Sequence, residues 1–237
     1  MEDIRSDKRI ACLVQARMGS SRLPNKSLIS ICNRPLFLLH IDRLRKAKTV
    51  SEIFVLTSEN NCDDIIVDIC KFEKICYYRG NENNVLERYF KFIDQSNYNH
   101  FIRTTADCPF VSHQLLDDLV KIYFNPQNNY DYVSNIIQPS YPYGIHVEVF
   151  NKNALTTAYL NAKITYDKEH VTPYIYKKPK RFKLYNHYNS QNISNYKLAV
   201  DTTDDLRTIT KLFHKMNNDR YANFLDAIEI LKSLNDD

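Results

Sequence analysis

The sequence contains few glycines, three in 237 residues, at Gly19, Gly80 and Gly144. Neither of the common phosphate-binding glycine patterns, GxxxxGK[ST] and GxGxxG, is present. The chain therefore lacks the usual P-loop and dinucleotide-binding loops, and any phosphate site must be built in another way. So few glycines also indicate that each one stands where the backbone requires it.

The sequence also lacks cysteine pairs and long apolar runs. Its six cysteines form no CxxC pair and no Cys/His cluster with zinc spacing, and most stand in apolar surroundings. That pattern is typical of free thiols in a reducing compartment. No run approaches the length of a membrane span, and the charged first ten residues lack the apolar core of a signal peptide. We therefore expect a cytoplasmic protein that does not enter a membrane.

Charge of neither sign dominates. There are 32 basic and 28 acidic residues, for a formal net charge of +4, and no long Lys/Arg block. This balance does not favour a nucleic-acid partner. A small anionic ligand remains compatible, because it needs only a local positive patch. With 43% hydrophobic residues, the composition is that of an ordinary folded protein.

Short apolar runs alternate with amphipathic stretches in the first half of the chain. The runs predict strands at residues 10–15, 52–57, 75–78 and 101–104, and the stretches predict helices at 35–47, 63–72, 85–94 and 112–124. Such alternation with short joins is typical of a parallel sheet covered by helices on both faces, an α/β fold. The pattern then loosens, with strands expected at 145–150, 182–188 and 196–200 and helices at 152–162, 203–216 and 221–234.

The loop after the first strand, "RMGSSRLPNK", is rich in groups that bind anions. Ligands of such sheets bind beyond the carboxyl ends of the strands, which is where this loop lies. The groups able to converge on a polyphosphate are Arg17, Arg22 and Lys26, with N–H and hydroxyl donors from Gly19, Ser20 and Ser21. An exposed basic loop is the structural alternative, but the position of the loop and the stiffening Pro24 favour phosphate binding.

Two aspartates stand at the same predicted edge. Asp107 in "TTADCP" can organise a turn or ligate Mg²⁺, and its spacing supports both alternatives equally. Asp201 in "LAVDTTDD" precedes a predicted helix that Thr202 and Asp205 cap. The cap leaves Asp201 free to supply a second metal-binding carboxylate.

Polar residues in the second half of the chain are candidates for the wall of an acceptor pocket. In "YPYGIHVEVF", His146 and Glu148 share one face of the predicted strand, which is either solvated or part of that wall, and Tyr143 lies just before it. His170 in "KEHVTP" is a further candidate, although a surface helix end also explains it.

The loop and helix after the third strand are less distinctive. Arg79 and Gly80 follow that strand directly, where contact with a base or ribose competes with a simple turn. In "NVLERYF" the apolar positions predict ordinary helix packing, with Arg88 solvated.

In this order, the stretches resemble the cytidylyltransferases that make CMP-activated acidic sugars, most closely the branch named after spore-coat polysaccharide biosynthesis protein F. The motifs that carry the resemblance are "QARMGSSRLPNK", "YRGNENNVLERY", "ADCPFV", "YDYVSN", "YPYGIHVEVF", "EHVTPYIY" and "VDTTDDL". The resemblance covers nearly the whole chain. It implies one nucleotidyltransferase domain, residues 1–237, with a three-layer, Rossmann-like (glycosyltransferase-A-like) sheet. It also implies CTP and an anionic small-molecule acceptor as substrates, Mg²⁺ as cofactor, and a homodimer, with an excursion at about residues 130–195 that contacts the second copy or the acceptor.

The resemblance also assigns roles to residues. Nucleotide binding falls on Gln15, Ala16, Arg17, Gly19, Ser20, Ser21, Arg22, Lys26, Arg79, Gly80 and Thr105. Arg17, Lys26 and Asp107 would be catalytic, Asp107 and Asp201 would bind Mg²⁺, and Tyr143, His146, Glu148 and His170 would contact the acceptor.

This chain departs from the family pattern at several positions. The usual glycine before the lysine is Asn25, a residue that tolerates the left-handed backbone region, and the glycine before the metal aspartate is Ala106. Two carboxylates common in relatives are replaced by Asn83 and Asn84, and an aspartate by His146. A glycosyltransferase that uses a nucleotide sugar, a uridylyl- or guanylyltransferase, and a non-catalytic nucleotide-binding relative are the alternatives. "ADCP" has a single aspartate where glycosyltransferases usually carry a DxD motif, which disfavours the first of them.

Overall fold

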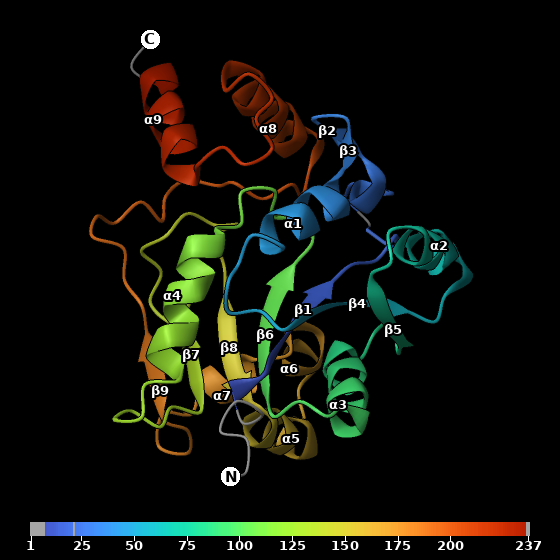
Figure 1. Cartoon of the computed structure of the whole chain (residues 1–237), viewed down its shortest axis with the longest axis vertical. Coiled ribbons are helices and arrows are strands. Elements are labelled where there is room, and N and C mark those ends of the chain that lie inside the picture. Colours follow the sequence, from blue (N-terminus) through green and yellow to red (C-terminus); the bar gives the residue numbers. More distant parts are fainter. Residues whose placement is uncertain (1–7, 21, 236–237) are drawn as a thin grey trace.

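The computed structural model describes residues 8–20 and 22–235. Its centre is a seven-stranded sheet in the order β5-β4-β1-β6-β8-β7-β9, shown in Figure 1. The strands are Ile10–Gln15 (β1), Glu52–Ser58 (β4), Cys76–Gly80 (β5), His100–Thr105 (β6), Tyr132–Ser134 (β7), Glu148–Asn151 (β8) and Leu184–Asn186 (β9). β8 runs antiparallel to both of its neighbours, and the other pairings are parallel. The predicted mostly parallel sheet is confirmed.

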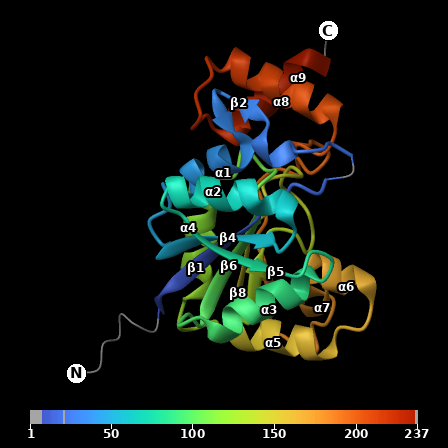
Figure 2. The same cartoon turned by 90° about the vertical axis from the view of Figure 1, so that its right-hand side faces the viewer.

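Helices cover both faces of the sheet. One layer contains α1 (Leu36–Leu44), α2 (Asp64–Phe72) and α4 (His113–Tyr123), with α8 (Thr203–Lys215) and α9 (Phe224–Asn235) packed at its end. The other contains α3 (Val85–Gln95), α5 (Lys152–Asn161) and α7 (Pro173–Tyr176), with α6 (Thr165–His170) beside α3 (Figure 2).

The continuous apolar run of β1 explains why two helical layers form. Cys12 and Val14 pack into the layer of α1, whereas Ala11 and Leu13 pack into the layer of α3. All four side chains are fully buried. Successive side chains of a strand point to opposite faces, so an unbroken apolar strand needs cover on both sides.

One strand predicted for the second half of the chain is wrong, and another begins later than predicted. The strand predicted at 145–150 begins at Glu148, and residues 196–200 form only an isolated bridge, between Tyr143 and Lys197. Gly144 explains why the bridge does not extend into a ladder. Its φ of +102° turns the chain away, and an added Cβ would lie 2.6 Å from the backbone nitrogen of Ala199. This glycine therefore stands where the backbone requires it.

The excursion predicted at about residues 130–195 forms part of the same sheet. It supplies β7, β8 and β9, and β8 pairs directly with β6. Its three helices, α5, α6 and α7, lie on the α3 side of the sheet (Figure 2). Across the described residues, no helix combines the length and apolar character that crossing a membrane requires.

Candidate active site

A cleft of about 660 Å³ opens at the carboxyl ends of the central strands. The loop after β1 and helix α6 both border it, and Figure 2 shows them on the same side of the molecule. The predicted site residues that line it are Gln15, Ala16, Arg17, Ser20, Arg22, Lys26, Thr105, Asp107, Tyr143, His146, His170 and Asp201. The structure thus gathers onto one surface residues that are up to 186 positions apart in the sequence.

Lys26 lies between the two aspartates predicted to bind metal. Its Nζ is 2.6 Å from Oδ2 of Asp107 and 3.1 Å from Oδ1 of Asp201. Burial opposes the charge on Lys26, but attraction to Asp107 and then Asp201 outweighs it and raises the pKa of the ammonium. Burial also opposes the charge on Asp107 and would raise its pKa, but the positive charge of Lys26 lowers that pKa. Lys26 and Asp107 are therefore both charged at neutral pH.

The backbone conformation of Asn25 brings Lys26 to this position. Asn25 adopts φ 59° and ψ 19°, the left-handed conformation expected from its replacement of a family glycine, and it caps the short helix η2 (Lys26–Leu28). The next residue but one, Ser27, donates from Oγ to the backbone oxygen of Arg17 at 2.9 Å. Asparagine adopts this region more readily than most residues, so the turn survives the substitution.

Two backbone contacts hold Asp201 opposite Asp107 although residues 196–200 form no strand. The N–H of Val200 donates to the backbone oxygen of Asp107 at 2.9 Å. The predicted cap of α8 is confirmed as a capping box between Thr202 and Asp205, and Asp205 also accepts from the N–H of Asp201. The carboxylate of Asp201 is left pointing at Lys26, with Lys197 3.1 Å from its other oxygen.

Asp63 fixes the first loop, a role that the sequence did not reveal. Its Oδ1 accepts from the N–H of Met18 at 2.7 Å, and its Oδ2 accepts from Thr57 and Ser58. The carboxylate is fully buried. Burial would raise its pKa, but these hydrogen bonds lower it. The sequence placed Asp63 only at the start of a predicted helix, because a bond to a residue 45 positions away leaves no local pattern.

We expect Asp63→Asn to weaken nucleotide binding as well as stability. An amide cannot accept all of these hydrogen bonds, so at least one buried donor loses its partner, at a cost of about 1–3 kcal/mol. Asp117→Asn is the matched control, because Asp117 also accepts from backbone N–H groups, those of Lys48 and Thr49, but away from the cleft. Denaturant unfolding should show a loss for both variants, and calorimetric titration with CTP a loss for Asp63→Asn alone. Equal CTP affinities would contradict the assigned role.

The far end of the cleft is lined by aromatic and imidazole rings. His146 packs edge-on to Tyr143, with 5.0 Å between ring centroids, and His170 packs on Tyr166 at 4.3 Å. Burial lowers the pKa of His146, which favours the neutral ring. Tyr166, Glu169, Thr172 and Tyr176 also line this end. The sequence drew attention to Glu169 beside His170, but not to the other three residues.

The backbone is strained at this end of the cleft. Val171 has φ 73° and ψ −58°, and the N–H of Thr172 donates to the oxygen of His170 at 2.9 Å, which closes a γ-turn. A β-branched residue in this region costs about 1–3 kcal/mol, and such strain clusters at functional sites. The turn places His170 and Thr172 in the cleft wall while Val171 is fully buried.

Glu148 does not share a face of the cleft with His146, contrary to the prediction. It is buried beneath the cleft floor, where it forms an ion pair with Arg103 and accepts from the hydroxyls of Tyr132 and Thr172. Arg103 lines the cleft and donates to Gln15 at 3.2 Å. Because β8 begins only at Glu148, the strand alternation assumed for residues 145–150 does not hold.

The structure does not bring every predicted residue into the cleft. Arg79 forms an ion pair with Asp64, Gly80 packs against a helix, and Gly19 is exposed outside the lining. Ser21 lies outside the described residues. The expected solvation of Arg88 is wrong, because this side chain is fully buried.

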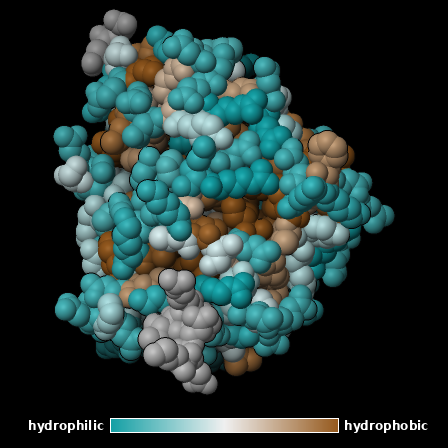
Figure 3. All heavy atoms as spheres, in the orientation of Figure 1, coloured by the Kyte–Doolittle hydropathy of each residue, from teal (hydrophilic) through white to brown (hydrophobic). Residues whose placement is uncertain are grey.

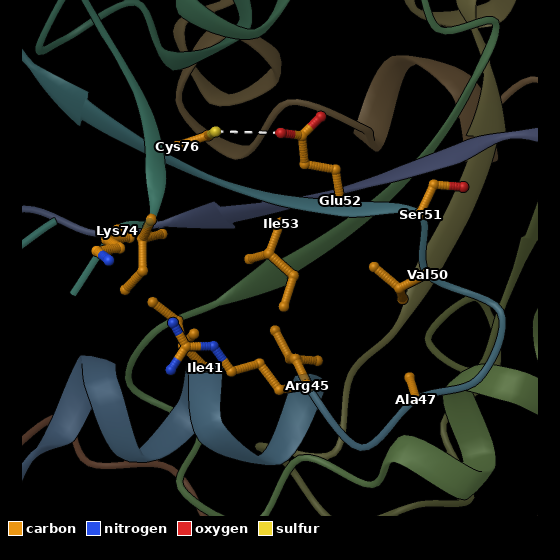
Figure 4. A pocket seen from close by; sticks show the side chains of 11 residues that line it. Ile41, Arg45, Ala47, Val50, Ser51, Glu52, Ile53, Lys74 and Cys76 are labelled. Carbon is orange, nitrogen blue, oxygen red and sulfur yellow. Dashed lines mark hydrogen bonds between the residues drawn. The ribbon is translucent and has the colours of Figure 1, made fainter. Parts of the chain in front are cut away.

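A second, smaller cavity of about 300 Å³ lies at the opposite end of the strands. It lies below α1, near the first residues of β4 and β5, and Figure 4 shows Ile41, Ile53 and Arg45 around it. Figure 3 shows apolar side chains near the centre of the face that Figure 1 presents to the viewer. None of the predicted site residues lines this cavity, so the cleft is the better candidate for an active site.

Comparison with known proteins agrees with this geometry. The family model described as "Cytidylyltransferase" matches residues 11–235. The chain is a member of the cytidylyltransferase family. The matched residues include the first loop, both aspartates and the His170 end of the cleft.

Two individual relatives and one solved structure resemble this cytidylyltransferase over most of its length. Spore coat polysaccharide biosynthesis protein SpsF of Bacillus subtilis is 32% identical over 213 residues, 87% of each chain. An uncharacterized protein of Methanocaldococcus jannaschii is 34% identical over 236 residues, 96% of this chain and 94% of its own. The solved structure of a cytidylyltransferase from Leptospira borgpetersenii superposes with a TM-score of 0.90 at 28% identity, covering 96% of this chain and 95% of that one. The resemblance to the spore-coat branch and the nucleotidyltransferase fold are thereby confirmed.

Proposed function

We propose that this cytidylyltransferase transfers CMP from CTP to an acidic sugar or phosphorylated small molecule and releases pyrophosphate, in cell-surface polysaccharide or glycoconjugate biosynthesis. The observation that carries the proposal is the Lys26–Asp107–Asp201 cluster in a cleft that arginines and aromatic rings also line. The relative SpsF, which is named for polysaccharide biosynthesis, supports the pathway.

The residues of the cleft suit phosphoryl chemistry. An acceptor oxygen would attack the α-phosphorus in line and displace pyrophosphate, a step that needs positioning and charge neutralisation more than covalent help. Arg17, Arg22 and Lys26 supply positive charge from one loop, so they are placed to bind the triphosphate. The Arg22 side chain is 68% exposed and forms only a long ion pair of 3.7 Å with Asp201. Such a loosely held side chain is able to move onto a ligand.

Asp107 and Asp201 fit a Mg²⁺ ion held jointly with substrate phosphates. Magnesium usually takes one or two carboxylates plus phosphate oxygens, and these two carboxylates already share one cation, the ammonium of Lys26. The described residues contain no cluster of three or more acidic, His or Cys side chains that could hold a metal unaided. The proposed ion therefore depends on substrate phosphates for its remaining ligands. The ion would neutralise charge on the phosphates.

The acceptor would bind at the Tyr143, His146 and His170 end of the cleft. The family resemblance implies an aspartate at the position of His146, and a ring in place of a carboxylate removes a negative charge that would repel an acidic acceptor. The backbone strain at Val171 holds the neighbouring His170 in the same wall. A carboxylate or phosphate acceptor needs no general base, which suits a neutral His146. The homodimer predicted from the resemblance stays a prediction.

Thermal unfolding with CTP, UTP, GTP and ATP, each with and without Mg²⁺, tests the proposal without an acceptor. A ligand at about a hundred times its Kd adds about 2.7 kcal/mol of stability. At this size each kcal/mol moves Tm by roughly 2–4 °C. We expect a shift with CTP that Mg²⁺ enlarges, and smaller shifts with the other nucleotides. If no nucleotide raises Tm, the assignment of the cleft to a nucleotide fails.

A further inference from the structure

Arg88 is a buried charge that the proposed reaction leaves unexplained. It stands on α3, its side chain is fully buried, and it heads the fully buried side chains by volume. None of its three guanidinium nitrogens has a hydrogen-bond partner among residues 8–20 and 22–235. An unpaired buried charge is costly, so its retention calls for a compensating gain.

Arg43 shows how the same chain stabilises another buried guanidinium. Its side chain is also buried, at 3% exposed. Its nitrogens donate to three backbone oxygens, those of Val111 (2.9 Å), Arg220 (2.7 Å) and Ala222 (3.0 Å). Arg103, another largely buried arginine, forms an ion pair with Glu148. Within the described chain Arg88 has neither kind of partner.

Arg88 lies close behind the phosphate end of the cleft. It packs on Gly80, where an added Cβ would come within 2.9 Å of its Cγ, and Val85, one turn earlier on α3, lines the cleft. Burial lowers the pKa of Arg88; Tyr89 opposes this shift, and the positive charge of Arg17 adds to it. Two positive charges therefore lie close enough to repel each other, one of them lining the cleft.

The nearby carboxylates Asp63 and Glu82 offset this charge only in part. Asp63 already accepts from Met18 on one oxygen and from Thr57 and Ser58 on the other. Glu82 is bonded to Asn60. In the described part of the chain neither carboxylate forms an ion pair with an arginine. The positive end of the α3 helix dipole adds to the excess of positive charge.

We propose that the missing counter-charge is the polyphosphate of the substrate, and that Arg88, together with Arg17, selects ligands that carry a polyphosphate over those that carry one phosphate. The identity of the nucleotide rests on the proposed function, whereas the preference for polyphosphate rests on the charges alone. A triphosphate relieves the repulsion between Arg17 and Arg88, and a monophosphate offers less charge to do so. The site therefore favours CTP over the CMP ester of an acidic sugar, which keeps a single phosphate once pyrophosphate has left.

Arg88→Met tests this role, because methionine removes the charge and still fills space with an unbranched side chain. Calorimetric titrations with CTP, CMP and inorganic tripolyphosphate give the affinities, and thermal unfolding gives the stability without ligand. We expect the Kd for CTP and for tripolyphosphate to weaken about 10- to 100-fold, the scale of removing one positive charge close to the phosphates in a partly buried site. The Kd for CMP should change less than about threefold. The ligand-free Tm should stay level or rise, because an uncompensated charge is gone.

Arg43→Met is the matched control, and its expected effects are the reverse. It should lower the ligand-free Tm, because three backbone oxygens lose their donors, and leave all three affinities unchanged. If Arg88→Met binds CTP and tripolyphosphate as tightly as the wild type does, Arg88 is a packing residue and the proposal is overturned. Arg88→Gln, which keeps a polar tip, serves if the methionine variant does not fold. Failure of both to fold would also overturn it.

The same titrations separate this inference from the proposed function. If the wild type binds tripolyphosphate in an Arg88-dependent way but binds CTP no more tightly than tripolyphosphate, the polyphosphate site stands and the cytidylyl substrate falls. If the wild type binds none of the three ligands, both fail.

Discussion

Replacing Asp107 with asparagine should abolish turnover while the fold stays intact. The carboxylate lies 2.6 Å from Lys26 and is 23% exposed at the cleft, so the substitution changes charge without opening a cavity in the core. We propose that Asp107 holds Mg²⁺, so loss of its carboxylate should slow catalysis at least about 100-fold, the scale of removing one charge-stabilising group. Pyrophosphate release from CTP, with whichever acidic acceptor the wild type uses, measures the effect.

A thermal-shift measurement and a control variant test this prediction more strictly. The part of the CTP-induced thermal shift that depends on Mg²⁺ should disappear in Asp107→Asn, and it needs no acceptor. Asp117→Asn should keep both turnover and that Mg²⁺-dependent shift, because its carboxylate bonds only to backbone and side chain at Lys48 and Thr49. Normal turnover with normal Mg²⁺ dependence in Asp107→Asn would remove this residue from the site.

Replacing Lys26 with alanine should raise the reaction barrier by about 3 kcal/mol, so that kcat falls more than a hundredfold. The ammonium sits between two carboxylates in the ligand-free cleft, and we propose that it moves to the phosphates when the nucleotide binds. Steady-state kinetics separates the alternatives. A change in KM with kcat preserved would make Lys26 a simple binding group and contradict a role in the transition state.

The ligand-free state of Lys26→Ala gives an independent check. Asp107 and Asp201 then lose the cation they share, and Lys197 and the exposed Arg22 remain on Asp201 alone. We expect a lower Tm without ligand and a larger gain in Tm from Mg²⁺ alone than in the wild type, because the carboxylates repel each other and no ammonium competes for them. An unchanged response to Mg²⁺ would argue against a metal site at these two aspartates.

Local sequence was sufficient wherever a short stretch fixes its own conformation. The apolar run of β1 required helices on both faces, Asn25 kept a left-handed turn in place of glycine, and Thr202 with Asp205 capped α8. The position of loops at the carboxyl ends of parallel strands then brought Lys26 and Asp107 together without any knowledge of the coordinates.

The predictions failed where a distant segment decides the outcome. Residues 196–200 read as a strand, but the turn at Gly144 takes the pairing segment away after one bridge. Arg88 read as a solvated helix position because burying a charge without a partner is unfavourable, and no local pattern indicates it.

By itself, then, the sequence determined the α/β architecture and the position of the basic loop and the two aspartates at one edge of the sheet, because strand and helix periods, turn residues and caps act over a few neighbouring positions. The tertiary structure alone decided that Asp63 holds the loop, that Glu148 pairs with Arg103 beneath the cleft, and that Arg88 is buried beside it. These contacts join segments tens of residues apart, and their energies depend on burial and on neighbouring charges that exist only once the chain has folded.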